Sequence, residues 1–349
     1  MKKFLDRKGV SLSPKVYFVD AMGSMALGLF ASLLMGTILS TIATYTGWSI
    51  LSEAAGYASG ATGIILGIAI ANSLKAPLLV LYSAGVVGMA GYSMGSAFLI
   101  GGEEKLLTAG PAGAFFAVIV AAEIGKLVSK ETNIDILVTP SVTILSGVLF
   151  CKLICPAVSY AMYYIGWFIN YATEMQPIVM GILISVAVGV ALTLPISSAA
   201  ICAMIGISGL AGGAATVGCC AQMVGFAVIS FRENRVGGLV AQGLGTSMLQ
   251  MGNLTKNPRL WIPPTLTAAI LGPISTTLFK LENAGVSAGM GTCGLVGPLG
   301  VISATPNSAM KWVGVFLLLF VAPAVLSLIF SEIMRKIGWI KENDLKLDL

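Results

Sequence analysis

Histidine is absent from the 349 residues, and charged residues are scarce. Without an imidazole, the chain has no histidine general base, no histidine metal ligand and no phosphohistidine of its own. Asp, Glu, Lys and Arg make up 10% of the sequence, whereas about 25% is usual in a soluble domain. A soluble protein of this length needs more charge to cover its surface. The composition therefore excludes a soluble enzyme, a nucleic-acid-binding protein and a disordered chain.

Long uncharged stretches separate the few charged residues. A run of about 20 apolar residues in a helix is long enough to cross the hydrocarbon core of a bilayer. The stretches of this kind are residues 21–52, 54–74, 76–102, 106–122, 153–173, 236–255, 260–279 and 312–331. The pattern predicts an all-α polytopic membrane protein with about ten transmembrane helices. For residues 135–171 the sequence leaves two alternatives, one long helix kinked at Pro156 or two separate elements.

Two stretches do not fit simple membrane-spanning helices. Residues 175–231 carry no charge, and their centre, residues 195–222, is rich in Gly, Ser and Thr. Residues 283–306 have the same character. Irregular backbone is tolerated at membrane depth only where protein or a water-filled cavity covers it. The sequence therefore predicts two re-entrant hairpins, at about 195–222 and 273–300.

The two predicted hairpins repeat one pattern. The motif P-I-S-[ST] occupies residues 195–198 and 273–276, and G-x-x-x-G-x-x-T-x-G follows at residues 209–218 and 285–294. Transporters built from repeats bring paired discontinuous helices together near the membrane midplane, where they bind a polar ligand. The alternative reading is close helix packing through small residues. We expect that packing role for Gly85, Gly88, Gly91 and Gly95.

Hydroxyl, amide and carboxyl groups of the hairpins are the candidate solute-binding groups, since they bind hydroxyls directly. The carboxylate of Glu282 beside the amide of Asn283 would accept hydrogen bonds from a polyol; a loop acid facing water is the equally weighted alternative. We predict no catalytic residue, no metal ligand and no cofactor. The predicted substrate-binding residues are Ser197, Ser198, Thr216, Gln222, Ser275, Thr276, Glu282, Asn283 and Thr292.

Residues 192–228, LTLPISSAAICAMIGISGLAGGAATVGCCAQMVGFAV, resemble the enzyme IIC-like membrane proteins of the phosphotransferase system. Residues 134–145, 242–276 and 288–300 extend the resemblance, which is greatest to the PfoR-like branch. The resemblance implies a homodimer. Residues 1–172 would form scaffold and dimerisation helices, and residues 173–349 a transport core around a sugar. It also implies a separate cytoplasmic IIB-type protein that phosphorylates the sugar.

The sequence departs from the sugar-transporting members in one place. The fructose-type motif G-I-T-E-G-A-I-P-F, with its acidic residue, is missing, and residues 212–217 read GGAATV there. We also expect no attached IIA or IIB domain. The leading hypothesis is a permease that binds and translocates a small polar solute, a sugar or polyol. The alternatives are a PfoR-type membrane sensor that signals to a cytoplasmic partner, and a transporter of a non-sugar solute.

Positive charge gathers at both ends of the sequence. Five Lys or Arg residues lie within residues 2–15 and four within residues 335–346. Cytoplasmic segments of membrane proteins carry an excess of these residues. We therefore expect a multi-pass protein of a bacterial plasma membrane, surrounded by lipid, with both termini in the cytoplasm and no nucleic-acid partner.

Overall fold

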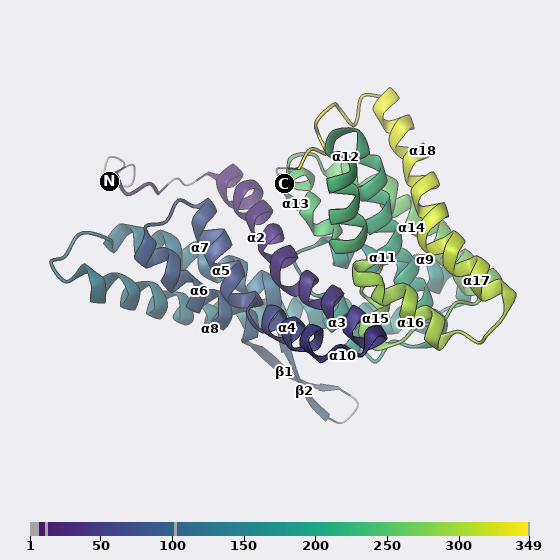
Figure 1. Cartoon of the computed structure of the whole chain (residues 1–349), viewed down its shortest axis with the longest axis horizontal. Helices are drawn as coiled ribbons and strands as arrows, with labels where there is room; N and C mark the ends of the chain where they lie inside the picture. Colours follow the sequence, from purple (N-terminus) through teal and green to yellow (C-terminus); the bar gives the residue numbers. More distant parts are fainter. Residues whose placement is uncertain (1–6, 11–12, 101–102, 348–349) are drawn as a thin grey trace. The chain divides into compact units, whose positions relative to one another are not determined.

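The computed structural model describes residues 7–10, 13–100 and 103–347, and the chain forms two compact units (Figure 1). The first unit comprises Met1–Gly36 and Glu53–Ala161, and the second comprises Thr37–Ser52 and Met162–Leu349. Helices α3 (Met35–Thr46), α4 (Ser49–Gly60) and α8 (Asp135–Thr173) contain residues of both units. The other elements of the first unit are α2 (Met22–Leu29) with π-helical turns at Val16–Ala21 and Phe30–Leu34, α5 (Thr62–Ser73), α6 (Leu78–Ser93), β1 (Gly95–Ile100), β2 (Glu103–Thr108) and α7 (Gly110–Val128).

The second unit is made of helices and short helical turns. π-helical turns continue or follow several of its helices, at Ala241–Gly245, Ser275–Phe279 and Leu317–Val321. Its helices are α9 (Pro177–Thr193), α10 (Ser198–Met204), α11 (Gly209–Ile229), α12 (Phe231–Val240), α13 (Met251–Lys256), α14 (Ile262–Ile274), α15 (Gly285–Ala288), α16 (Val296–Ala304), α17 (Ala309–Phe316) and α18 (Ala322–Lys336).

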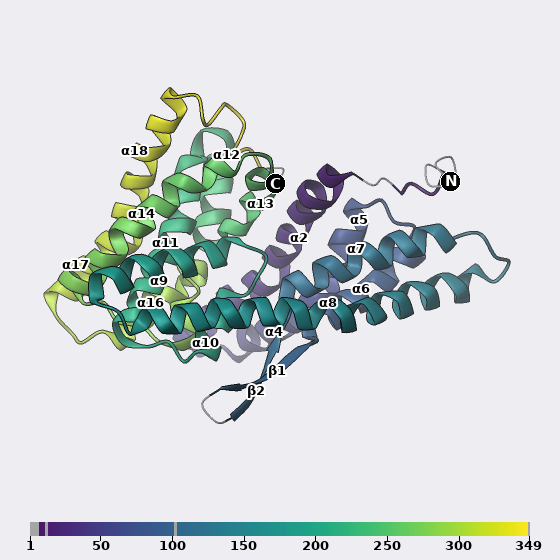
Figure 2. The ribbon, with the colours of Figure 1, turned by 180° about the vertical axis from the view of Figure 1, so that it is seen from behind.

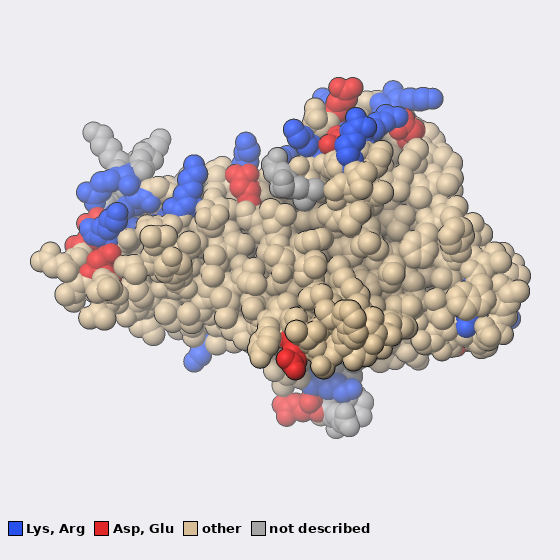
Figure 3. Space-filling model, in the orientation of Figure 1, with Lys and Arg blue, Asp and Glu red and all other residues tan. Residues whose placement is uncertain are grey.

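The described helices confirm the prediction of an all-α polytopic membrane protein. Six are long and apolar enough to cross a bilayer, and α4 with α5, bent by 49°, makes a seventh if the pair is one span. Three shorter apolar helices lie at Leu78–Ser93, Pro177–Thr193 and Cys293–Ala304, so the predicted count of ten is not confirmed. Figure 3 agrees with this assignment, because most of the visible surface between small charged patches is uncharged. The six long segments are Val16–Thr46, Gly110–Val128, Asp135–Thr173, Gly209–Ile229, Pro258–Phe279 and Ala309–Lys336.

Helix α8 answers the question left open for residues 135–171. It is a single helix of 39 residues with Pro140 and Pro156 inside it. At a rise of about 1.5 Å per residue it is longer than a bilayer crossing requires. Proline removes one backbone hydrogen bond and bends a helix, but the apolar residues on both sides allow this one to continue.

A β-hairpin stands where the sequence suggested a long apolar helix. Helix α6 ends at Ser93, and β1 pairs antiparallel with β2 from Gly95 opposite Thr108 to Ile100 opposite Glu103 (Figure 1, Figure 2). A Cβ at Gly95 would overlap the carbonyl of Leu107, so glycine permits the two strands to meet there. Within the uncharged stretch 76–102 the helix therefore covers only Leu78–Ser93, because a short apolar run does not distinguish strand from helix.

Glycines bring the helices of the first unit into backbone contact. A Cβ at Gly88 of α6 would overlap the carbonyl oxygen of Gly63 in α5, and one at Gly91 would lie 2.7 Å from the carbonyl oxygen of Gly113 in α7. A Cβ at Gly85, on the same helix, would meet the isoleucine side-chain atoms Ile64 Cγ2 and Ile68 Cγ1 at 3.2 and 3.3 Å, and backbone only at 3.6 Å. Close packing through small residues thus holds α5, α6 and α7 together.

We predict that Gly88→Ala destabilises the protein and that Gly85→Ala does so far less. The new methyl group at position 88 must push the α5 backbone away, which costs about 1–3 kcal/mol in the free energy of unfolding. At position 85 the neighbouring isoleucine side chains need to move by only a few tenths of an ångström. Thermal unfolding in detergent measures both variants, and equal shifts in Tm would contradict the packing argument.

Candidate functional site

Helix α11 lies at the centre of the second unit and is almost completely buried. It runs parallel to α9, since Gly218 meets Ser185 and, further along both helices, Gln222 accepts a hydrogen bond from Thr193. Helix α14 packs antiparallel to α9, with the Ser185 hydroxyl donating to the carbonyl of Ala268 at 2.8 Å. Helix α11 therefore positions the segments that carry the predicted site.

The chain turns back between α9 and α11. Helix α9 ends at Thr193, and the backbone passes through α10 before α11 begins at Gly209. Since α9 and α11 are parallel, the intervening residues 194–208 return from the end of one helix to the start of the next. Residues 209–222, which the sequence placed in the hairpin, belong to the long helix α11. Glycine is no helix breaker where close packing compensates.

The second predicted hairpin is more irregular than the first. The π-helical turn Ser275–Phe279 ends at Lys280, which has φ 47°, and residues 281–284 are not helical. The short helix α15, a 3₁₀ turn at Cys293–Leu295 and α16 follow. This segment lies along α11, because Asn283 faces Gly212 and Gly291 faces Cys219.

The repeated glycines begin equivalent turns, and these turns pair with each other. Gly209 (φ 61°) starts α11 and Gly285 (φ 56°) starts α15, and each follows an extended residue. Glycine adopts a positive φ without steric cost. The Gly285 N–H donates to the carbonyl of Ile207 at 2.8 Å, and the Asn283 N–H donates to that of Gly209 at 3.2 Å. Two segments with the same motif thus meet through their own backbones.

Ser198, Thr216 and Asn283 bridge the two segments, and Ser287 supports Asn283 from within the second segment; we call these four side chains the hairpin junction. The Asn283 Nδ2 donates to Thr216 Oγ1 at 2.8 Å, and its Oδ1 accepts from the Ser287 hydroxyl at 2.6 Å. The Ser198 hydroxyl donates to the carbonyl of Gly289 at 2.7 Å. Thr216, Asn283 and Ser198 are 0–3% exposed. The junction is a buried, uncharged set of hydrogen-bonding groups.

Two glycines of α11 admit the second segment to the junction. A Cβ at Gly212 would overlap the carbonyl of Asn283, and one at Gly213 would overlap the carbonyl of Leu281. No side chain fits at either position without moving that backbone. This explains physically why the sequence has GG there.

Glu282 lies next to the junction with its backbone fixed and its carboxylate available. Its N–H donates to Thr305 Oγ1 at 2.9 Å, and its carbonyl accepts from the same hydroxyl at 3.1 Å. The side chain is half-buried, and within the described residues its carboxylate has no hydrogen bond or ion pair. Such a carboxylate can accept hydrogen bonds from a ligand.

The structure brings together only part of the predicted set. Ser198, Thr216 and Asn283 meet at the junction, with Glu282 beside them. The other five lie elsewhere. Ser197 caps α10, Gln222 donates to Thr265, Thr276 donates to the carbonyl of Pro177, Thr292 donates to that of Gly243, and Ser275 Oγ is buried without a partner among the described residues.

Sequence reasoning missed Ser287, Thr305 and Lys311. Ser287 follows Asn283 by four residues, a spacing that favours contact within a turn, and this was the available signal. No sequence pattern pointed to Thr305 or Lys311. Lys311 is 5% exposed, and its Nζ donates to the carbonyls of Ile302 and Thr305 at 3.0 and 3.2 Å. It thereby satisfies carbonyls at the C-terminal end of α16.

We predict that Asn283→Ala destabilises the second unit by about 1–3 kcal/mol, because it leaves Thr216 and Ser287 without their buried partner. Asn307→Ala is the matched control, since Asn307 is exposed and its side chain has no partner among the described residues. Unfolding monitored in detergent should separate the two variants. An Asn283→Ala protein as stable as the control would show that the junction does not hold the two segments together.

Comparison with known proteins gives one match. No curated protein and no solved structure matches the chain. The family described as "Phosphotransferase system, EIIC" matches residues 19–347, which is nearly the whole chain. This confirms the resemblance to enzyme IIC proteins, while the PfoR-like branch stays a prediction. The chain therefore belongs to the phosphotransferase-system EIIC family, whose members are membrane components of sugar transport.

Proposed function

We propose that the chain is a permease that binds a small polar solute, a sugar or a polyol, at the hairpin junction and carries it across the membrane. The observation that supports this is the direct pairing of the two repeated turns around buried hydroxyl and amide groups, beside the carboxylate of Glu282. Neutral donors and acceptors can bind hydroxyl groups without the cost of burying a charge.

The hydrogen bonds of the junction suggest how a solute enters. Asn283 and Thr216 each satisfy a partner from the other segment. A sugar hydroxyl both donates and accepts, so it can replace such a bond when the segments separate. We propose that the two segments act as re-entrant hairpins, as in repeat-built transporters, and that a rigid shift of the second half exposes the site alternately to each side.

The remaining parts of the proposal follow the family. Residues 1–172 serve as scaffold and dimerisation helices of a homodimer, and residues 173–349 as transport core. A boundary between compact units at Ala161 and Met162 supports this division, although residues 37–52 group with the second unit. Both termini lie in the cytoplasm of a bacterium. Since the chain lacks histidine, phosphorylation of the solute requires a separate IIB-type protein.

A PfoR-type sensor is the second candidate. The observation that favours it is the pair Gly212 and Gly213, which face backbone where the fructose-type relatives carry an acidic motif. A site without that acid can bind a ligand and report its presence to a cytoplasmic partner without transferring a phosphoryl group.

Transport of a non-sugar solute is the third candidate. An apolar cavity of about 330 Å³ lies in the second unit between α3 and the residues that follow the second hairpin turn. A cavity with this lining accommodates hydrocarbon rather than hydroxyl groups. Its lining residues are Thr41, Ile42, Tyr45, Thr46, Leu295 and Leu299.

We predict that Glu282→Gln reduces solute uptake by roughly tenfold or more, since a hydrogen bond to a charged group contributes about 1.5–3 kcal/mol. Ser198→Ala should reduce it by about two- to tenfold, since a neutral hydrogen bond contributes about 0.5–1.5 kcal/mol. Proteoliposomes and a panel of labelled hexoses, hexitols and N-acetylhexosamines provide the assay. Glu174→Gln is the control, because Glu174 is an exposed acid of the second unit. It should transport at the wild-type rate.

The same assay separates the three candidates. Saturable flux that both variants reduce supports the permease, and specific binding without flux supports the sensor. Flux of an apolar solute alone supports the third candidate. Wild-type flux in both variants would remove the hairpin junction as the site.

A further inference from the structure

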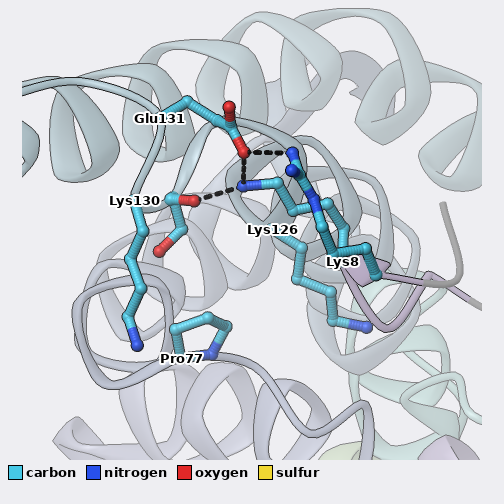
Figure 4. A pocket seen from close by; sticks show the side chains of 7 residues that line it. Lys8, Pro77, Lys126, Lys130 and Glu131 are labelled. Carbon is cyan, nitrogen blue, oxygen red and sulfur yellow. Dashed lines mark hydrogen bonds and ion pairs between the residues drawn. The ribbon is translucent and has the colours of Figure 1, made fainter. Parts of the chain in front are cut away.

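The first unit has a polar cavity of its own, with a volume of about 360 Å³. Figure 4 shows Lys8, Lys126, Lys130 and Glu131 around it, with Pro77 at one side. Arg7 and Ser129 complete the lining. Four of the seven lining residues are basic and one is acidic.

The cavity lies where membrane-spanning helices end. Ser129, Lys130 and Glu131 belong to the short connection between α7 and α8, both of which are long and apolar enough to cross a bilayer. Pro77 lies in the connection between α5 and α6. The ends of spanning helices meet the lipid headgroups, so this cavity faces the interfacial layer of the membrane.

The charges that line the cavity are incompletely paired. Glu131 binds both Arg7, at 2.7 Å, and Lys8. Lys126 is 2% exposed and pairs with Glu123 at 3.1 Å. The ammonium group of Lys130 has no partner within the described residues, although its backbone N–H donates to the neighbouring Asp135. Even when Glu123 and Asp135 are counted, positive charge remains in excess.

Two features keep these groups in place. The hydrogen bond from Lys8 and the charge of Arg7 hold the pKa of Glu131 below its usual range, so this carboxylate stays ionised and retains both cations. Lys130 has φ 61°, a conformation unfavourable for lysine, and its N–H bond to Asp135 fixes it there. Strain of this kind persists where the surroundings impose it, and it is common at binding sites.

We propose that this cavity binds the phosphate group of an anionic ligand. A phosphate offers several charged oxygens, which can accept hydrogen bonds from the Lys130 ammonium and the Arg7 guanidinium. The planar set of donors on a guanidinium matches the geometry of a phosphate. Two sources have this chemistry: the phosphodiester of an anionic phospholipid and a free phosphate. The interfacial position favours the lipid, since basic residues there attract anionic headgroups.

Native mass spectrometry of the full chain in detergent tests the site with phosphatidylglycerol, phosphatidylcholine and inorganic phosphate. The wild type should bind phosphatidylglycerol more tightly than phosphatidylcholine. Lys130→Ala should weaken phosphatidylglycerol binding by about fivefold, the effect of one basic residue near an anionic surface. Lys130→Arg should preserve it. Lys105→Ala is the matched control, because Lys105 is an exposed lysine of β2 in the same unit, and it should bind as the wild type does.

Inorganic phosphate distinguishes the two sources. If millimolar phosphate leaves bound phosphatidylglycerol in place, the site takes the lipid. If phosphate displaces the lipid and raises the Tm of the wild type but not of Lys130→Ala, the site takes a free phosphate. The proposal would be overturned if the wild type bound the two lipids equally and did not respond to phosphate. It would also be overturned if Lys130→Ala and Lys105→Ala lost phosphatidylglycerol binding to the same extent. Because Lys130 is exposed, its replacement by alanine should leave folding intact, and thermal unfolding checks this.

Discussion

The second unit depends on glycines that let other backbone touch helix α11. Gly212 faces the carbonyl of Asn283, Gly213 faces that of Leu281, and Gly218 faces the backbone of Ser185 in α9. Inside a membrane every backbone polar group must find a partner within the protein, so a non-helical segment such as 281–284 needs cover. Helix α11 provides that cover because its glycines leave room. The position of the hairpin junction is a consequence of this contact.

In the proposed permease, the junction couples solute binding to movement. Asn283 links the two repeated segments, since its Nδ2 donates to Thr216 in α11 and to the carbonyl of Gly297 in α16. Any motion that separates the segments breaks these bonds and leaves buried polar groups unsatisfied, which is costly. A solute that supplies hydroxyl groups removes this cost. A neutral junction can therefore bind a solute and allow the motion with the same hydrogen bonds.

The sequence alone could predict the fold class and the meeting of the repeats, but not the contacts between distant segments. Charge-free runs indicate membrane helices, and the paired motifs correctly led to Gly209 and Gly285, whose positive φ values start the two turns. The β-hairpin was missed because an apolar run from residue 95 has no helical or strand periodicity of its own. Gln222 donates a hydrogen bond to Thr265, which lies 43 residues away in the sequence, and no local pattern predicts this contact.

Several of the few basic side chains of this chain bind carbonyl groups at the ends of helices. Three basic side chains donate to carbonyls at the C-terminal ends of α7, α16 and α11, where unpaired carbonyls and the helix dipole favour positive charge. They are Lys8 with Ser129, Lys311 with Thr305, and Arg335 with Ile229. These cations satisfy carbonyls at the ends of helices. Lys130 differs from them, because its ammonium group has no carbonyl or carboxylate partner within the described residues. Its charge is therefore available to an anion from outside the chain.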